Sequence, residues 1–242
     1  IIAARPAMGK TAFALNLAVN AASKSDKAVA LFNLEMSAEQ LAMRMIAAAG
    51  GIEMNKVRTG RLEHNDWKKV NEAMSELSET NLYIEDNAGM TISEIRAKCR
   101  RLATSDKGLG LIVIDYLQLI SGSSKNEGNR VQEVSEISRS LKTMAMELKV
   151  PVVALAQLSR SVELRENKRP IMSDLRESGS IEQDADIVMF LYRYDYYNKA
   201  AAEQTDTSIT ELIIGKHRNG GTGTIELLFE RSMSNFINYI NK

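Results

Sequence analysis

Residues 3–11 read Ala-Ala-Arg-Pro-Ala-Met-Gly-Lys-Thr, and residues 12–18 continue as Ala-Phe-Ala-Leu-Asn-Leu-Ala. An apolar start, a tight turn ending in Gly9-Lys10-Thr11 and a helix-forming stretch are the strand–loop–helix pattern of a phosphate-binding loop. Backbone N–H groups and the positive end of the helix hold nucleotide phosphates in such a loop. Lys10 is expected to reach the outer phosphates, and the Thr11 hydroxyl to bind Mg²⁺. The residues expected to bind the nucleotide are Arg5, Pro6, Ala7, Met8, Gly9, Lys10, Thr11 and Ala12.

The loop departs from the general pattern at Ala4, because that pattern has a glycine five residues before Gly9. Short Gly-Lys-Thr sequences also occur by chance. The alternative interpretation is an exposed helix that begins near Gly9 and carries a solvated Lys10. The apolar stretch before the motif and the helical stretch after it favour the phosphate-binding loop.

Composition restricts the class of protein. The chain has 242 residues, 44% of them hydrophobic, which suffices for one large α/β domain or two small ones. Basic and acidic residues number 31 each, so nucleic-acid binding would depend on local basic loops. A single cysteine, Cys99, excludes an intrachain disulfide and is typical of a reducing, cytoplasmic setting. No run approaches the roughly 20 apolar residues that span a bilayer, so no membrane partner is expected. Because Ile1 begins the chain inside a predicted strand, we expect a fragment.

Strand and helix patterns alternate along most of the chain. Nearly continuous apolar runs at 27–34, 109–115 and 150–156 predict strands buried on both faces of a parallel sheet. Further strands are predicted at 1–5, 82–84 and 187–192, and helices at 10–23, 37–50, 91–103 and 131–148, with helical spacing also in 53–80. The sequence therefore predicts one α/β domain over 1–242, with a mostly parallel twisted sheet covered by helices on both faces.

Two regions lie outside this alternation. Residues 158–185 have little periodicity and many charges, which predicts a long functional loop. Strands predicted at 209–216 and 224–229 are joined by Asn219-Gly220-Gly221, a hairpin turn signal. A short strand is also expected within 236–240. The hairpin predicts an antiparallel extension at one edge of the sheet.

Polar residues follow several predicted strands. Glu35 follows the strand at 27–34, Asp115 closes the strand at 109–115, and Gln157 follows the strand at 150–156. Ligands of open α/β sheets bind beyond the carboxyl ends of the strands. These three side chains are therefore expected to gather around the phosphate-binding loop.

Each of these residues has a predicted role and an alternative. Asp115 follows four apolar residues, as does the aspartate that holds Mg²⁺ in nucleotide hydrolases; otherwise it caps a loop. Glu35 is the candidate general base, because Tyr116 rather than a second acid follows Asp115; otherwise it is a charge near a helix start. Gln157 is expected to hydrogen-bond the terminal phosphate, or else to tie down a loop.

The predicted hairpin carries two cations, Lys216 and Arg218, on a projecting turn. Such cations can stabilise the charge that develops on a transferred phosphoryl group. The turn lies far along the chain from Gly9, so it could serve the site of a neighbouring subunit in a ring or filament. The alternative is a solvated turn.

Several loops are rich in Gly, Ser and basic residues. They lie at 121–130, 158–170 and 174–179 and suit contacts to nucleic-acid phosphates, although charged loops are often only solvated. They contain no aromatic residue, which argues against readout by base stacking.

Taken together, these stretches resemble bacterial replicative DNA helicases of the DnaB type, in their C-terminal motor domain. The resemblance covers essentially the whole chain and includes the usual Ala4 of that family. It rests on AARPAMGKTAFALN (3–16), FNLEMS (32–37), LIVIDYLQLI (111–120), EVSEISRSLK (133–142), PVVALAQLSR (151–160), RPIMSDLRESGSIEQDADIV (169–188) and GKHRNGGTGTI (215–225).

The resemblance implies a RecA-like core in which the Gln157 strand lies between the phosphate-loop strand and the Asp115 strand. It implies a homohexameric ring that uses ATP and Mg²⁺, in which Lys216 and Arg218 act on ATP bound by the adjacent subunit. The positions expected to contact single-stranded DNA are Arg130, Arg176, Glu177 and Gly179. The resemblance further implies an N-terminal helical domain and a linker helix, which are not expected within residues 1–242, and it implies primase and a helicase loader as partners of the full-length protein.

Two other functions are left open by the sequence. A RecA-type strand-exchange ATPase would share the core and form filaments, but residues 169–188 favour the helicase. A module that binds ATP only to close a ring would not need a general base, so Glu35 argues against it.

Overall fold

The computed structural model describes residues 1–122, 129–198 and 205–240, and for residues 176–179 it describes the backbone alone. Within this part of the chain, nine strands form one sheet in the order β3-β2-β4-β5-β1-β6-β7-β8-β9. The strands are β1 (Ile2–Ala4), β2 (Ala28–Asn33), β3 (Leu82–Glu85), β4 (Leu109–Asp115), β5 (Val152–Gln157), β6 (Ile187–Arg193), β7 (Thr207–His217), β8 (Gly223–Glu230) and β9 (Asn235–Asn238). Neighbours from β3 to β6 are parallel, and β6 to β9 are antiparallel.

The mostly parallel α/β prediction and the antiparallel extension are therefore confirmed. β5, which ends in Gln157, lies between β4 and β1, as the family resemblance implied. A parallel sheet needs crossover connections, and helices supply them here. The helices are α1 (Lys10–Ser23), α2 (Ala38–Gly50), α3 (Met54–Thr59), α4 (His64–Ser78), α5 (Ile92–Ala103), α6 (Arg130–Leu148), α7 (Gly179–Asp184) and α8 (Tyr194–Tyr197).

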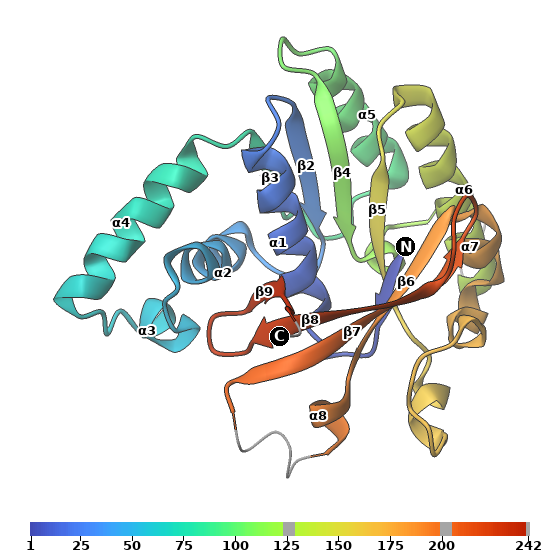
Figure 1. Cartoon of the computed structure of the whole chain (residues 1–242). Helices are drawn as coiled ribbons and strands as arrows, with labels where there is room; N and C mark the ends of the chain where they lie inside the picture. The colour runs from blue at the N-terminus through green and yellow to red at the C-terminus, as the bar shows by residue number, and fades with distance from the viewer. Residues whose placement is uncertain (123–128, 199–204, 241–242) are drawn as a thin grey trace.

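Each face of the sheet has its own apolar core, with α1 and α2 on one side and α5 and α6 on the other (Figure 1). β4 shows why its sequence is apolar throughout. Leu111 and Val113 join the core under α1, whereas Ile112 and Ile114 join the core under α5 and α6. Successive side chains of a strand point to opposite faces, so a strand covered on both sides needs no polar alternation. Cys99 packs in the second core, where burial raises the pKa of its thiol to about 12.

Local signals set the helix ends. Ser37 with Gln40 forms a capping box at the start of α2, and Thr91 with Glu94 forms one at the start of α5. Both satisfy backbone N–H groups that the first turn of a helix leaves free. Gly51 ends α2 in the left-handed conformation. No helix in the described residues is long and apolar enough to cross a membrane.

The C-terminal strands return to the phosphate-binding loop. The backbone N–H of Phe236 donates to Asn16 Oδ1 at 2.8 Å, and the ring of Phe236 meets Phe13 edge-on at 5.3 Å between centroids. Phe229 stacks on Phe236 at 4.4 Å. This aromatic group fastens β8 and β9 to the first turns of α1, next to the phosphate-binding loop, and so supports the loop. In Figure 1, β9 lies beside the N-terminal end of α1.

The prediction of a long loop at 158–185 was wrong in its local structure. The segment contains two 3₁₀ helices, η3 (Arg160–Leu164) and η4 (Met172–Ser178), followed by α7. Helices this short leave too few turns for a periodic apolar pattern. Arg165 and Asp174 form a two-point ion pair at 2.8 Å for each bond, which holds the segment together by a tertiary contact.

Candidate functional site

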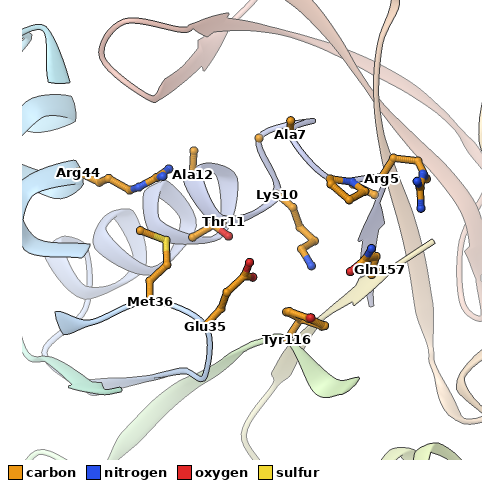
Figure 2. Close-up of a pocket in the computed structure, with 13 residues that line it drawn as sticks. Arg5, Ala7, Lys10, Thr11, Ala12, Glu35, Met36, Arg44, Tyr116 and Gln157 are labelled. Atoms are coloured by element: carbon orange, nitrogen blue, oxygen red, sulfur yellow. The ribbon is translucent and has the colours of Figure 1, made fainter. Parts of the chain in front are cut away.

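A cavity of about 240 Å³ lies where the carboxyl ends of β1, β2, β4 and β5 meet (Figure 2). Its position agrees with the expectation that polar strand ends gather at one edge of the sheet. The lining residues are Ala4, Arg5, Pro6, Ala7, Gly9, Lys10, Thr11, Ala12, Glu35, Met36, Arg44, Tyr116 and Gln157. Of the residues expected to bind the nucleotide, Met8 does not line the cavity, because its side chain is buried in the core.

The loop at 5–9 bends sharply into α1. Gly9 has φ 93°, a conformation that strains residues with a side chain, and a Cβ added there would crowd the Phe236 ring at 3.0 Å. Ala7 also has a positive φ, 63°. α1 begins at Lys10, and its free N–H groups face the cavity with the positive end of the helix dipole. This is the arrangement in which backbone amides hold an anion.

Thr11 and Asp115 meet although they are far apart in the sequence. The Thr11 hydroxyl donates to Asp115 Oδ2 at 2.6 Å. Asp115 Oδ1 is buried and accepts no hydrogen bond from the described residues, with Lys10 Nζ at 3.8 Å. A hydroxyl and a carboxylate with a free oxygen fit Mg²⁺, which takes few protein ligands and completes its shell with water and phosphate. Groups of three or more acidic, His or Cys ligands are absent from the described residues.

Lys10 is the cation at the centre of the cavity. Its side chain is 13% exposed, its Nζ lies 4.4 Å from the centroid of the Tyr116 ring, and it points between Glu35 and Gln157 (Figure 2). Burial lowers the pKa of Lys10, and the charges of Asp115 and Glu35 oppose that shift. Burial therefore outweighs the two carboxylates in its effect on the pKa of Lys10.

Glu35 reaches the cavity through a turn that Asn33 organises. Asn33 is buried at the end of β2, and its Oδ1 accepts from the backbone N–H groups of Glu35 (3.0 Å) and Met36 (2.7 Å). Its Nδ2 donates to Asp115 Oδ2 at 3.2 Å. One amide thus joins the Glu35 turn to the end of β4. The Glu35 carboxylate faces the loop beside Thr11 and Lys10 (Figure 2).

Arg5 lies at the rim and turns away from the cavity centre (Figure 2). Its guanidinium donates to Glu163 Oε1 at 3.0 Å and to the Leu158 carbonyl at 2.8 Å. These bonds join the loop to η3 and to the residue that follows β5. The side chain is therefore engaged within the fold, although the residue belongs to the predicted nucleotide-binding set.

Lys216 and Arg218 lie on the other side of the sheet's strand ends. The carboxyl edge is where the parallel strands end, and these two residues lie at the opposite edge, where the parallel strands begin. Ile2 of β1 pairs with Met189 of β6, and Ile187, two residues earlier, pairs with His217 of β7. The end of β7 is thus level with the amino end of β1, whereas the phosphate-binding loop follows its carboxyl end. A chain cannot bring both edges of its own sheet to one site.

The two cations contact α7 and the residues after it. Lys216 Nζ donates to the Glu182 carbonyl at 2.6 Å, and Arg218 Nη2 to the Gln183 carbonyl at 3.2 Å. Arg218 also pairs with Asp186 at 3.5 Å and remains half exposed. Cations suit the carbonyl end of a helix.

The four candidate DNA-contacting positions are only partly described. Arg130 is exposed at the start of α6 and pairs with Glu133 at 2.8 Å. Arg176 and Glu177 lie in η4, and Gly179 begins α7, which packs against α6; the side chains at 176–179 lie outside the description. The loop at 121–130 was also expected to contact nucleic acid, and its residues 123–128 lie outside the described part of the chain.

Comparison with known proteins identifies the family. Residues 1–238 match the model of the DnaB-like helicase C terminal domain. The chain belongs to this family. The resemblance inferred from the sequence motifs is thereby confirmed.

The similarities to individual members of the DnaB-like family are extensive. The chain is 59% identical over 238 residues to the replicative DNA helicase DnaC of Bacillus subtilis (strain 168), which covers 98% of this chain and 52% of that protein. The replicative DNA helicase DnaB of Geobacillus stearothermophilus gives the same identity and coverage. The chain thus spans about half the length of the curated relatives it matches.

Solved structures agree with this assignment. One solved ATPase domain is 46% identical with a TM-score of 0.92, and the match covers 99% of this chain and 84% of that one. A DnaB-like replicative helicase studied for its interactions with primase has the same identity and TM-score and covers 99% and 57%. A KaiC-like protein of Pyrococcus horikoshii OT3, 16% identical with a TM-score of 0.60, shares the fold alone.

Four residues of this DnaB-like site were missed by sequence reasoning as members of the site. Tyr116, Met36 and Arg44 line the cavity, and Asn33 holds Asp115 and the Glu35 turn through hydrogen bonds. Tyr116 and Asn33 could have been found, because both stand at strand ends beside predicted site residues. Arg44 lies within α2, about one turn beyond Gln40 of the capping box, and no local pattern distinguishes it from other arginines on helices. Its Nε is buried and lacks a hydrogen-bond partner in the described structure.

Proposed function

We propose that this chain is the motor domain of a replicative DNA helicase, which hydrolyses Mg-ATP between subunits of a homohexameric ring and translocates on single-stranded DNA. The observation that carries the proposal is the division of the site. One edge of the sheet has a phosphate-binding loop with Lys10, Thr11 and Asp115, and the opposite edge has Lys216 and Arg218. Copies stacked head to tail would join the two edges at every interface, and such contacts form a ring when the rotation between copies closes.

The loop and Lys10 bind the phosphates in this proposal. Backbone N–H groups at the start of α1 hold the inner phosphates, and Lys10 neutralises charge on the outer ones. Thr11 and Asp115 would hold Mg²⁺, which when bound would neutralise phosphate charge. The lowered pKa of Lys10 supports this role, because an incoming anion compensates a buried ammonium.

Glu35 orients the attacking water and accepts its proton. General-base catalysis requires the carboxylate to stand beside the reacting centre, and Glu35 lines the same cavity as Lys10. The bonds from Asn33 fix the turn that carries it. Gln157, at the rim opposite Glu35, contacts the terminal phosphate and changes position when that phosphate is released.

Lys216 and Arg218 complete the site of the adjacent subunit. Cations supplied from outside stabilise the charge that develops during phosphoryl transfer, an effect on the order of 10³–10⁵ in rate in related systems. Both side chains hold carbonyl groups in the free chain, so they must exchange these contacts for the phosphate.

Single-stranded DNA passes on the side where η4, α7 and the start of α6 lie together. Arg130, Arg176, Glu177 and Gly179 contact its backbone. Binding through phosphate contacts is independent of sequence and weakens as salt rises. The remaining half of the full-length protein would supply the N-terminal helical domain and the linker. Primase, which the related DnaB-like helicase binds, and a helicase loader are the expected partners.

Subunit mixing tests the division of the site. Lys10→Ala and Arg218→Ala proteins, made from the complete gene, are each expected to be inactive, while Arg218→Ala still binds ATP. When the two proteins are mixed in equal amounts, about a quarter of the interfaces combine an intact loop from one subunit with an intact Arg218 from the next. ATP hydrolysis should therefore return on mixing. No recovery, or normal hydrolysis by Arg218→Ala alone, would disprove action between subunits.

Two further results would favour other functions. Open filaments in electron microscopy would indicate a RecA-type strand-exchange protein. Absence of DNA-stimulated ATP hydrolysis in the full-length protein would indicate a module that uses ATP only as a ligand for ring closure.

A further inference from the structure

Gln118 holds the end of β5 from outside the sheet. It lies on the 3₁₀ helix η1 (Leu117–Leu119), shortly after Asp115, and its side chain is half-buried. Its Nε2 donates to the Gln157 carbonyl at 3.3 Å, and its Oε1 accepts from the Gln157 backbone N–H at 3.3 Å. The register of β4 and β5 ends at Ile114 and Ala154, so these two bonds continue the pairing where the strands separate.

The same residue also contacts a candidate DNA-binding side chain. The Gln118 carbonyl accepts a hydrogen bond from Arg130 Nη2, and Arg130 Nη1 donates to Glu133 at 2.8 Å. Gln118, Arg130 and Gln157 line a common small cavity of about 60 Å³. One residue therefore touches the backbone of Gln157 on one side and the guanidinium of Arg130 on the other.

We propose that Gln118 is a positioning residue that couples the nucleotide at Gln157 to the DNA at Arg130. The inference rests on the proposed function. When loss of the terminal phosphate shifts Gln157, the two-point amide contact moves η1 and thereby the carbonyl that orients Arg130. In the other direction, a DNA phosphate competes with the Gln118 carbonyl and Glu133 for the guanidinium. Because binding free energies are linked, each ligand must change the affinity of the other by the same factor.

A second connection runs from the same strand end to η4. The Ser159 backbone N–H donates to the Asp174 carbonyl at 3.2 Å, and Arg165 holds the Asp174 carboxylate. This route does not use Gln118. Removing the Gln118 side chain therefore reduces the coupling carried through Arg130 and leaves the connection to η4 in place.

The experiment compares Gln118→Met with Gln132→Met in protein from the complete gene. Methionine keeps the length of the side chain without its amide, and Gln132 is an exposed glutamine in the first turns of α6. ATP hydrolysis is measured with and without oligo-dT. The affinity for oligo-dT is measured with ADP and with a non-hydrolysable ATP analogue. In Gln118→Met, basal hydrolysis should stay within about twofold, while both the DNA stimulation and the nucleotide dependence of affinity fall at least about fivefold. Gln132→Met should behave as the wild type.

The outcomes separate the two proposals. Wild-type stimulation in Gln118→Met would overturn the coupling role and leave the helicase proposal intact. If oligo-dT does not stimulate ATP hydrolysis by the wild-type protein, both the helicase proposal and the coupling role are overturned.

A double variant distinguishes coupling from a general structural defect. If Gln118 acts through Arg130, adding Gln118→Met to Arg130→Ala causes no further loss of stimulation. If Gln118→Met lowers DNA stimulation as much in the Arg130→Ala protein as in the wild type, Gln118 only supports the fold. Gln118→Glu provides a second variant. It retains the acceptor for the Gln157 N–H but places an oxygen against the Gln157 carbonyl, so its stimulation should be intermediate; full stimulation would also overturn the proposal.

Discussion

The two edges of the sheet differ in how they hold their cations. At the carboxyl edge, Lys10 is nearly buried beside the fully buried Asp115, and short contacts fix the groups around it. At the opposite edge, the side chain of Arg218 is 51% exposed and pairs with a half-exposed Asp186 at 3.5 Å. The groups of the first edge are fixed by short contacts, whereas at the second edge Arg218 remains half exposed to solvent.

The difference has an energetic meaning. Groups fixed in a water-poor site interact strongly with a ligand, because they need little reorganisation when it binds. Exposed ion pairs contribute little to stability. The carboxyl edge should therefore matter for both activity and folding, and the turn at Lys216 and Arg218 for activity alone.

The largest effect is expected at the buried cation. Lys10→Ala should lower the turnover of ATP by on the order of 10³ or more, because Lys10 is the cation that points into the centre of the cavity, whereas Arg5 turns away from it. Steady-state hydrolysis measures it, and Lys24→Ala, at the exposed end of α1, is the matched control. A residual rate above about a tenth of the wild type would mean that the loop binds phosphate differently.

The candidate base comes next. Glu35→Gln should slow hydrolysis about a hundredfold or more, because the amide cannot accept the proton of water, while ATP binding persists. Glu39→Gln, on the exposed first turn of α2, should change neither property. Binding of a fluorescent ATP analogue and single-turnover hydrolysis separate the two effects. Unchanged hydrolysis would remove Glu35 from the role of base.

A smaller effect on stability is expected at Asn33. Asn33→Leu should lower the free energy of unfolding by about 1–3 kcal/mol, since buried partners at Asp115 and in the Glu35 turn lose their hydrogen bonds. Urea denaturation measures this, with the exposed Asn20→Leu on α1 as control. A variant as stable as the wild type would indicate that water replaces the amide.

The smallest effect is expected from the exposed turn. Arg218→Ala should change the free energy of unfolding by less than about 1 kcal/mol, because its ion pair is long and solvated. The same urea denaturation measures this change in stability. The small change should contrast with the large loss of ATP hydrolysis expected for Arg218→Ala in the assembled protein. If Arg218→Ala destabilises the protein as much as Asn33→Leu, the turn contributes to folding as the carboxyl edge does, and the expected difference between the two edges is wrong.

Much of the carboxyl edge could be predicted from the sequence because its signals are local. The loop at Gly9, the apolar strands and the polar residues that close them all appear within short windows. The parallel arrangement then brings Glu35, Asp115 and Gln157 to one cavity without further information. Arg44 escaped prediction because its role depends on where α2 packs.

The sequence by itself determined the strand–loop–helix at Lys10, the buried strands, the capping boxes and the hairpin, because backbone conformation and binary burial follow from neighbouring residues. The tertiary structure alone decided that Asn33 joins the ends of β2 and β4, that Gln118 bridges Gln157 and Arg130, and that Arg218 faces away from the loop of its own chain. These features depend on the order, register and direction of strands distant in sequence. Long-range pairing is set by the whole fold, so no local pattern could contain it.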